Sequence, residues 1–362
     1  MIYFAYSSPL SATKPLFYNY SFSSSSSSTL SLSPAQTSSS MASNNEVVWE
    51  VPGYLRVYKD GHVERLAHPG PDFVTATYDP INEVSSKDII IEPNTGVSAR
   101  LYLPKQVENK PEKRFPVLVY YHGGGFCVGS AFSSWNQNNL NLLSSKANII
   151  IVAVEYRLAP EHPLPTGYED SWQALQWVIS ESNDEVWLQN HADFGRVFVS
   201  GDSAGGNIAH HMVMRIGSSE GMKLIKGMVL VHPYFWGVER LECEIEKAGN
   251  ESSKVLTVDT LDKIWPSVCH GTSGNDDDRI NPFVEGAPSL AGLGCEKVMV
   301  CVGGKDLLRG RGRIYYEKLK SSGWKGMVEF LESHGEDHCF HLFNPGCDKA
   351  LEMMKRLVDF FN

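Results

Sequence analysis

Residues 197–207 read Val-Phe-Val-Ser-Gly-Asp-Ser-Ala-Gly-Gly-Asn, an apolar run that passes into a serine flanked by glycines. The apolar run predicts a short buried strand over Val197–Ser200, and the spacing of apolar residues in Asn207–Ile216 predicts a helix. A Gly-x-Ser-x-Gly between a strand and a helix is typical of a turn that lifts a serine hydroxyl clear of a sheet. The glycines fit this turn because they lack Cβ atoms that would collide with the strand and the helix. Ser203 is therefore the candidate nucleophile.

A second glycine-rich motif lies upstream. His122-Gly123-Gly124-Gly125-Phe126 follows the apolar run Val117–Tyr121, which predicts another buried strand. Consecutive glycines allow backbone N–H groups to point inward with no side chain in the way. We expect the N–H groups of Gly124 and Gly125, with that of Ala204 at the start of the later helix, to form an oxyanion hole. Each such donor is worth about 3–4 kcal/mol in the transition state of acyl transfer.

A serine nucleophile also needs a base, and the base needs an acid that orients it. In proteins with this turn both follow the serine along the chain, the acid first. Asp306 follows the strand-like run Val298–Val302, and His338 follows the strand-like run Met327–Leu331. Parallel strands end at one edge of a sheet, so we expect both side chains near Ser203.

Other residues compete for these two roles. His334 lies closer to its strand than His338 and is the alternative base, expected to face solvent. Asp337 and Glu336 are alternative acids, but they adjoin the base and are poorly placed to reach its far nitrogen. We therefore choose Asp306 and His338.

The fold class follows from the alternation of apolar patterns. Runs without polar alternation, such as Ile149–Val154, are typical of strands that are covered on both faces. They alternate with helix-like stretches at 172–188, 309–321 and 349–361, which predicts an α/β domain with a mostly parallel sheet flanked by helices. The further strands expected are Ile89–Ile91, Ala99–Leu103 and Gly227–Val231.

Two segments break this alternation. Residues 46–80 hold scattered apolar side chains, and residues 236–279 contain no strand-like run but one helix-like stretch from Leu256 to Val268. Open α/β sheets place their sites at the carboxyl edge of the strands. We expect these two segments to form a helical cap over that edge, within one domain of residues 41–362.

The chain has 362 residues, with 32 Lys and Arg against 42 Asp and Glu, so its formal charge is −10. This acidity argues against a nucleic-acid partner and against binding to anionic membranes. The longest apolar stretch is too short to span a bilayer, so a soluble protein is expected. No His-Glu-x-x-His, Walker or dinucleotide motif occurs, so we expect neither a metal nor a cofactor. The seven cysteines form no Cys-x-x-Cys pair and are expected as free thiols in a reducing compartment.

Residues 1–40 differ from the rest of the chain. They contain no Asp or Glu, a single charged residue (Lys14) and six consecutive serines at 23–28. The segment lacks the charged start and apolar core of a secretory signal. Two interpretations stay open: a dispensable extension before Met41 of a cytoplasmic protein, or a transit peptide for the chloroplast, although transit peptides usually carry arginine.

Over residues 46–361 the sequence resembles the plant carboxylesterases of the hormone-sensitive-lipase-like α/β-hydrolase group. This resemblance implies a catalytic triad of Ser203, Asp306 and His338, small ester substrates with short acyl chains, and a cap from the N-terminal segment and the insertion. The motif from Glu155 to Pro165 is interpreted as structural, with Arg157 paired to Glu161. The residues that carry the resemblance are His122–Phe126, Glu155–Pro165, Gly201–Asn207, Asn281-Pro282, Lys305–Leu307 and Asp337–His341.

Two related classes remain as alternatives. The chain also resembles 2-hydroxyisoflavanone dehydratases, which eliminate water on the same scaffold; their nucleophile position can be threonine, whereas Ser203-Ala204-Gly205-Gly206 has the esterase form. Gibberellin receptors share the scaffold but lack the catalytic histidine, and the presence of His338 argues against that class. The sequence does not specify the ester or the oligomeric state.

Overall fold

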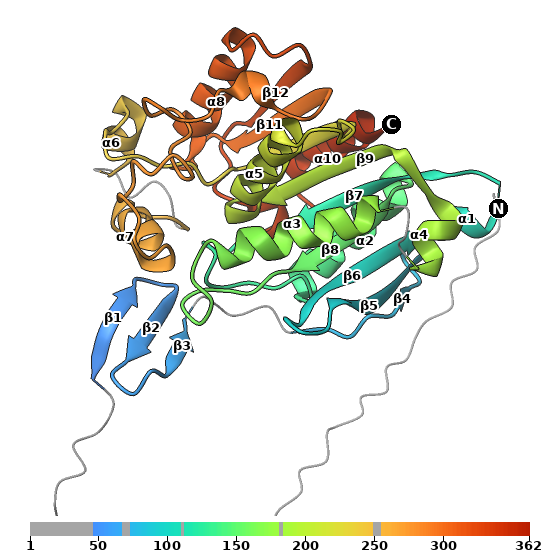
Figure 1. Cartoon of the computed structure of the whole chain (residues 1–362), viewed down its shortest axis with the longest axis horizontal. Coiled ribbons are helices and arrows are strands. Elements are labelled where there is room, and N and C mark those ends of the chain that lie inside the picture. The colour runs from blue at the N-terminus through green and yellow to red at the C-terminus, as the bar shows by residue number, and fades with distance from the viewer. Residues whose placement is uncertain (1–45, 67–72, 110–111, 181–183, 249–254) are drawn as a thin grey trace, which may run out of the picture. The chain divides into compact units, whose positions relative to one another are not determined.

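The computed structural model describes residues 46–66, 73–109, 112–180, 184–248 and 255–362 (Figure 1). The serine-rich segment of residues 1–40 lies outside the described residues. Within them, nine strands form one twisted sheet in the order β12-β11-β10-β9-β7-β8-β6-β5-β4. Strands β12 to β8 in this order run parallel, and β6, β5 and β4 are antiparallel at one edge. The strands are β4 (Tyr78–Asp79), β5 (Val84–Glu92), β6 (Val97–Pro104), β7 (Phe115–Tyr121), β8 (Ile150–Glu155), β9 (Ala192–Asp202), β10 (Gly227–Val231), β11 (Lys297–Gly303) and β12 (Met327–Ser333).

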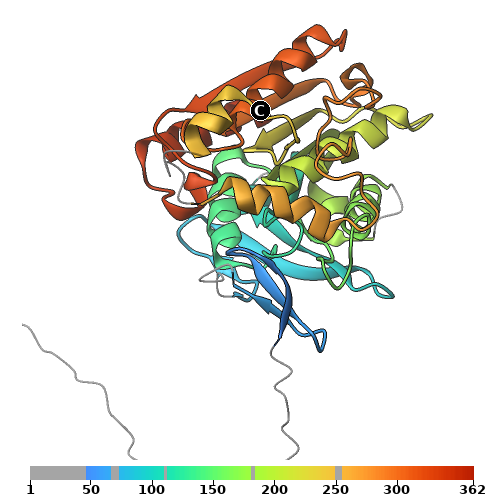
Figure 2. The same ribbon diagram turned by 90° about the vertical axis from the view of Figure 1, so that its left-hand side faces the viewer.

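Helices cover both faces of this sheet (Figures 1 and 2). On one face pack α3 (Thr166–Ile179), α5 (Ala204–Ser218) and α8 (Arg309–Ser321). On the other pack α2 (Ser134–Ala147), α9 (Phe340–Phe343) and α10 (Asp348–Phe361). The remaining helices are α1 (Gln106–Asn109), α4 (Val186–His191), α6 (Glu242–Ala248), α7 (Val258–Val268) and the short 3-10 turn Leu290–Gly292.

The central strand β7 shows why the core has two halves. All seven of its residues are buried. Val117 and Val119 pack into the cluster under α3 and α5, whereas Leu118 and Tyr120 pack into the cluster under α2 and α10. This division follows from the alternation of side chains along a strand. The α/β class and the mostly parallel sheet predicted from the sequence are thereby confirmed.

The prediction of one helix over residues 172–188 is wrong. Helix α3 begins at Thr166 and ends at Ile179, and α4 is a separate helix from Val186 to His191. The backbone is already extended at Ser180. Ser180 opens the stretch Ser-Glu-Ser-Asn-Asp in the sequence, and its Ser, Asn and Asp residues compete with helices for backbone hydrogen bonds.

The prediction of a helical N-terminal cap segment is also wrong. This segment forms an antiparallel sheet of β1 (Val47–Val51), β2 (Leu55–Tyr58) and β3 (Val63–Arg65). Residues 78–79 of the segment join the main sheet as β4. The physical reason is the share of valine and aromatic residues in these short runs, which suits strands rather than helices. Helices α6 and α7 do form in the insertion, and α7 contacts β1.

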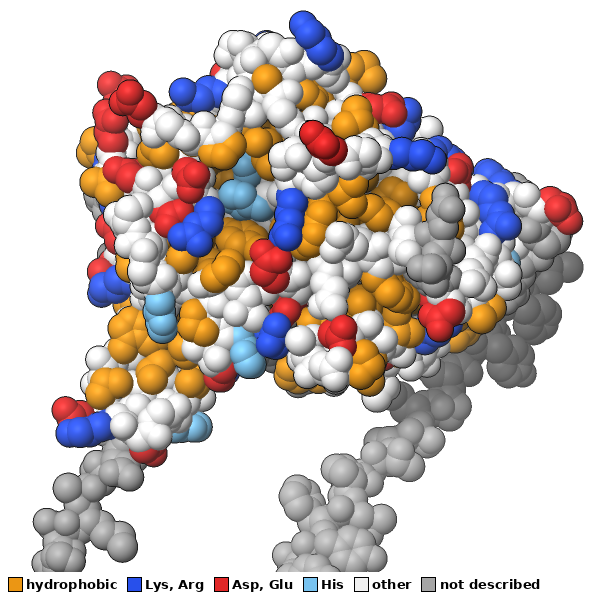
Figure 3. Space-filling view, in the orientation of Figure 1, with side chains coloured by type: hydrophobic (Ala, Val, Ile, Leu, Met, Phe, Trp, Pro, Cys, Tyr) orange, Lys and Arg blue, Asp and Glu red, His pale blue; other side chains and the backbone are white. Residues whose placement is uncertain are grey.

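Hydrophobic side chains are visible over the small sheet in the space-filling view (Figure 3), and Val47 and Val48 of β1 are exposed. Among the described helices, none has the length and apolar character that crossing a bilayer requires. All seven cysteines are free thiols, as the sequence predicted.

Candidate active site

The sharp turn at Ser203 joins β9 to α5. Ser203 has φ 54° and ψ −116°, a backbone conformation that non-glycine residues rarely adopt. The turn is held by the Ser203 N–H, which donates to Val231 O at 2.9 Å, and by the Ser203 carbonyl, which accepts from the Tyr234 N–H at 2.9 Å. Such strain costs about 1–3 kcal/mol and persists only where the surroundings fix it.

The flanking glycines are required by space. A Cβ atom on Gly201 would lie 2.2 Å from the Gly205 carbonyl oxygen, and one on Gly205 would lie 2.0 Å from the Tyr121 carbonyl oxygen. Both obstacles are backbone, which cannot move aside as a flexible side chain can. The crossing of α5 over β7 and β9 at this point therefore depends on the two glycines.

The glycine loop after β7 lies directly against the nucleophile. A Cβ atom on Gly123 would be 3.3 Å from the Ser203 Cβ. Gly124 and Gly125 have φ of 116° and 58°, and within the described chain their N–H groups have no hydrogen-bond acceptor. Ala204 is the first residue of α5, where N–H groups lack an intrahelical partner. Three backbone donors are thus free at this edge of the sheet.

The candidate acid and base meet in the protein interior. His338 Nδ1 lies 2.8 Å from Asp306 Oδ2, and both side chains are almost fully buried. The Leu308 N–H donates to Asp306 Oδ1 at 2.9 Å, which fixes the carboxylate from the other side. Asp306 follows β11 and His338 follows β12, so the parallel register places them at the same edge as Ser203.

The contact between Asp306 and His338 shifts the pKa values of both side chains. Burial alone would raise the pKa of Asp306, but the charge of His338 and two histidine hydrogen bonds outweigh burial and hold the pKa below its ordinary value. Burial alone would lower the pKa of His338, but the Asp306 carboxylate raises that pKa well above its usual 6.5. The site therefore favours an imidazolium next to a carboxylate, the state that forms when a base has taken a proton.

The loop that carries His338 also contacts the nucleophile turn. His341 Nε2 lies 3.5 Å from Oδ2 of Asp202, the residue before Ser203. Between the described Ser203 and His338 side chains no hydrogen bond is formed. Catalytic hydrogen bonds are often long before substrate binds, so this geometry is compatible with a base that takes the serine proton.

The competing residues lie elsewhere. The His334 side chain is 79% exposed and pairs with Glu332. Asp337 accepts the backbone N–H of His338 through its own Oδ1 at 2.7 Å. The structure therefore brings Asp306, and neither neighbouring carboxylate, to the His338 ring nitrogen.

The sequence profile of the α/β-hydrolase fold family matches residues 118–342, which include the glycine loop, the serine turn, Asp306 and His338. This chain belongs to the α/β-hydrolase fold family. A probable carboxylesterase of Arabidopsis thaliana is 45% identical over 321 residues, which are 89% of this chain and 98% of that protein. A 2-hydroxyisoflavanone dehydratase of Glycyrrhiza echinata is 44% identical over 90% of this chain and 99% of its own length. The solved structure of an esterase from Pyrobaculum calidifontis superimposes with a TM-score of 0.64 at 28% identity, covering 76% of this chain and 84% of that one.

Sequence reasoning missed one buried residue of this α/β-hydrolase site. His232 Nδ1 lies 3.0 Å from the same Asp306 Oδ2 that His338 contacts. The signal was present, because His232-Pro233 directly follows the strand-like run Gly227–Val231, at the carboxyl end of a strand, as Ser203 and His338 also follow strands. The potential ligand atoms of His232, Asp306 and His338 lie within 4.8 Å of one another, and hydrogen bonds account for this spacing.

The expected Arg157–Glu161 pair is wrong. Arg157 pairs with the buried Asp170 of α3 at 2.7 Å. Glu161 instead binds Arg65 of β3, through contacts of 3.0 and 2.7 Å to its two carboxylate oxygens. The sequence could not reveal this partner because Arg65 and Glu161 are 96 positions apart.

Arg65 also reaches the glycine loop. Its Nε donates to the Cys127 carbonyl at 2.9 Å, two residues beyond Gly125. From the same side, Tyr54 and Ile264 of α7 approach Gly125, where a Cβ atom would lie 3.4 Å from Tyr54 Cε1 and 3.2 Å from Ile264 Cδ1. The small sheet and α7 thus contact the loop that offers the free N–H groups.

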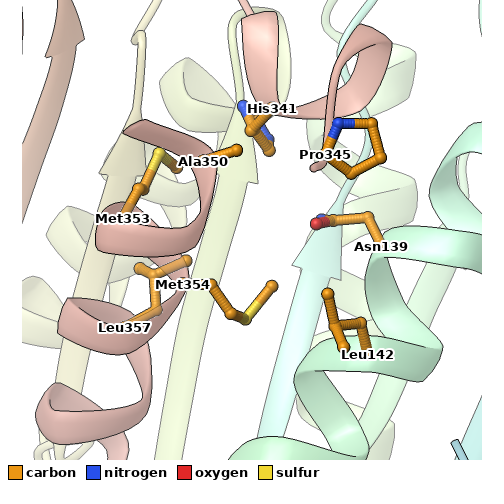
Figure 4. A pocket seen from close by; sticks show the side chains of 8 residues that line it. All are labelled: Asn139, Leu142, His341, Pro345, Ala350, Met353, Met354 and Leu357. Carbon is orange, nitrogen blue, oxygen red and sulfur yellow. The ribbon is translucent and has the colours of Figure 1, made fainter. Parts of the chain in front are cut away.

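A small cavity lies between α2 and α10, with His341 at one end (Figure 4). Met354 of α10 extends toward Leu142 of α2 across it. Its volume is about 10 Å³, about the minimum that holds one water molecule. It is too small for an ester substrate.

Proposed function

We propose that this α/β-hydrolase is a serine carboxylesterase in which Ser203 attacks the ester and Asp306 and His338 form the acid–base pair. The observation that carries the proposal is the position of Ser203 on a strained turn beside two free N–H groups, at the same sheet edge as a buried aspartate–histidine pair. A nucleophile, a base oriented by an acid and oxyanion donors are the parts that acyl transfer needs.

The reaction proceeds in two halves. As Ser203 Oγ bonds to the ester carbonyl carbon, His338 Nε2 takes the hydroxyl proton, and the N–H groups of Gly124, Gly125 and Ala204 stabilise the oxyanion. His338 then gives the proton to the leaving alcohol oxygen as the ester C–O bond breaks. A water molecule repeats the attack on the acyl-enzyme, with His338 again as the base, and releases the carboxylic acid and free Ser203.

A dehydratase is the second candidate, because a relative with that name is 44% identical over 90% of the chain. Purified full-length protein should be given 4-nitrophenyl acetate and, separately, a 2-hydroxyisoflavanone. We expect acetate and nitrophenol in equal amounts from the ester, and no isoflavone above the uncatalysed rate. Rapid isoflavone formation with slow ester turnover would establish the dehydratase instead.

The cap is proposed to consist of the small sheet and the insertion, and to favour short acyl chains. Ser203 is only 8% exposed, and Tyr54 and Ile264 bound the glycine loop beside it. Long acyl chains would have to displace these side chains. The small space beside Ser203 therefore supports small esters as the substrate class.

We expect Arg65→Met to lower kcat/KM for 4-nitrophenyl acetate by about three- to tenfold, because it releases the small sheet from the glycine loop. The effect is modest since the Arg65–Glu161 pair is partly exposed to solvent. The matched control is Arg56→Met, because Arg56 of β2 pairs with Glu50 and Glu64 inside the small sheet. Equal kinetics of the two variants would show that the small sheet does not influence the site.

The proposed location is the cytoplasm, with the chloroplast as the alternative if residues 1–40 are a transit peptide. The acid-free, serine-rich composition supports the alternative, and the absence of arginine argues against it. Sequencing the N-terminus of the mature protein from its native tissue distinguishes the two. A chain that begins close to residue 41 and copurifies with plastids would establish the chloroplast.

A further inference from the structure

His232 is a buried titratable side chain beside the site, and the proposed mechanism gives it no role. It follows β10, has φ 49°, and its backbone N–H donates to Cys301 O of β11 at 2.8 Å. The side chain is fully buried, and its ring centroid lies 5.6 Å from that of His338. The titratable groups that face it from the surrounding elements are Asp202, Asp306, His338, Cys339 and His341.

The ring nitrogen of neutral His232 that carries the hydrogen can be assigned by elimination. Two groups face His232 Nδ1: Asp306 Oδ2 at 3.0 Å and the Cys339 N–H at 3.2 Å. A hydrogen on Nδ1 gives a charge-assisted bond to the carboxylate, at the expense of the Cys339 contact. A hydrogen on Nε2 would set a nitrogen lone pair against the carboxylate and bury an N–H without an acceptor, because Nε2 has no partner in the described residues. The first arrangement therefore has the lower energy.

We propose that His232 is a positioning residue that donates Nδ1–H to Asp306 Oδ2 and so holds this carboxylate ionised and aimed at His338. Burial lowers the pKa of His232, so its ring stays neutral while the His338 ring takes the charge. Asp306 Oδ2 then accepts from two histidines, and only His338 exchanges a proton with the substrate. This inference rests on the proposed esterase function.

The test compares His232→Leu with His232→Asn, two side chains of similar shape of which only asparagine keeps a donor near the Nδ1 position. We expect His232→Leu to lower kcat for 4-nitrophenyl acetate by about 10- to 100-fold with KM changed by less than about threefold. The acid limb of its kcat/KM profile should move to higher pH, because an unshared carboxylate charge favours protonated His338. His232→Asn should restore kcat to within about threefold of wild type, with the acid limb unmoved.

A purely structural role would lower the thermal midpoint of both variants and leave the acid limb in place, and that result would overturn the proposal. Wild-type kinetics in His232→Leu would overturn it as well.

If the leucine variant does not fold, proton NMR of wild-type protein labelled with ¹⁵N-histidine decides the question. Two downfield ring N–H signals that are lost together in Asp306→Asn are expected, and a single signal would contradict the proposal. Failure of the esterase function is distinguishable, since wild type would then hydrolyse no more ester than Ser203→Ala.

Discussion

Ser203→Ala is expected to lower kcat for 4-nitrophenyl acetate by about 10⁴- to 10⁶-fold, because the nucleophile and its base act as one unit. The variant loses the atom that bonds to the acyl carbon, and His338 then has no proton to take. The thermal midpoint should change little, since alanine fits the same turn and the Ser203 hydroxyl has no hydrogen-bond partner among the described residues. Steady-state kinetics and thermal unfolding on the same preparation measure both quantities.

A phosphonate ester that reacts with activated serines provides the independent readout. Intact-mass spectrometry should show one adduct on the wild type and none on Ser203→Ala. The matched control is Ser219→Ala, a serine at the other end of α5 whose hydroxyl bonds the local Arg215 carbonyl. Ester hydrolysis by Ser203→Ala above about one per cent of wild type would remove Ser203 from the mechanism.

The second large effect is expected from Asp306→Asn, with a loss in kcat of about 10⁴-fold, the size seen for this change in other serine triads. The amide cannot stabilise protonated His338, and it can donate to His338 Nδ1 and so fix the wrong tautomer. The wild type should lose activity as the pH falls through the pKa of His338, which lies above 6.5 because of the Asp306 charge. Removing that charge lowers this pKa, so the residual activity should persist to lower pH.

The pH dependence of kcat/KM measures this shift, and Asp337→Asn is the control. Asp337 bonds the backbone of His338 rather than its ring, so we expect activity within about tenfold of wild type and an unmoved acid limb. If Asp337→Asn were the more damaging change, the assignment of the acid would pass to Asp337.

Much of the site could be read from local patterns. The strand before Ser203, the helix after it and the glycine loop at Gly124 are each defined by a few neighbouring residues, and all three occur as predicted. Asp306 and His338 could be chosen because parallel strands place their carboxyl ends at one edge. Short-range patterns therefore predicted the strands, the helix and the loops that carry the proposed catalytic side chains.

The sequence by itself determined the glycines on either side of Ser203, the aspartate Asp306 after a strand and the histidine His338 in a loop. Each of these could be recognised from residues close to it in the chain. Tertiary structure alone decided that Arg65 binds Glu161 and that His232 shares the Asp306 carboxylate. These contacts depend on which loops become neighbours, and the order of the strands in the sheet determines that. Side chains 74 positions apart, such as His232 and Asp306, meet only because β10 and β11 pair in register.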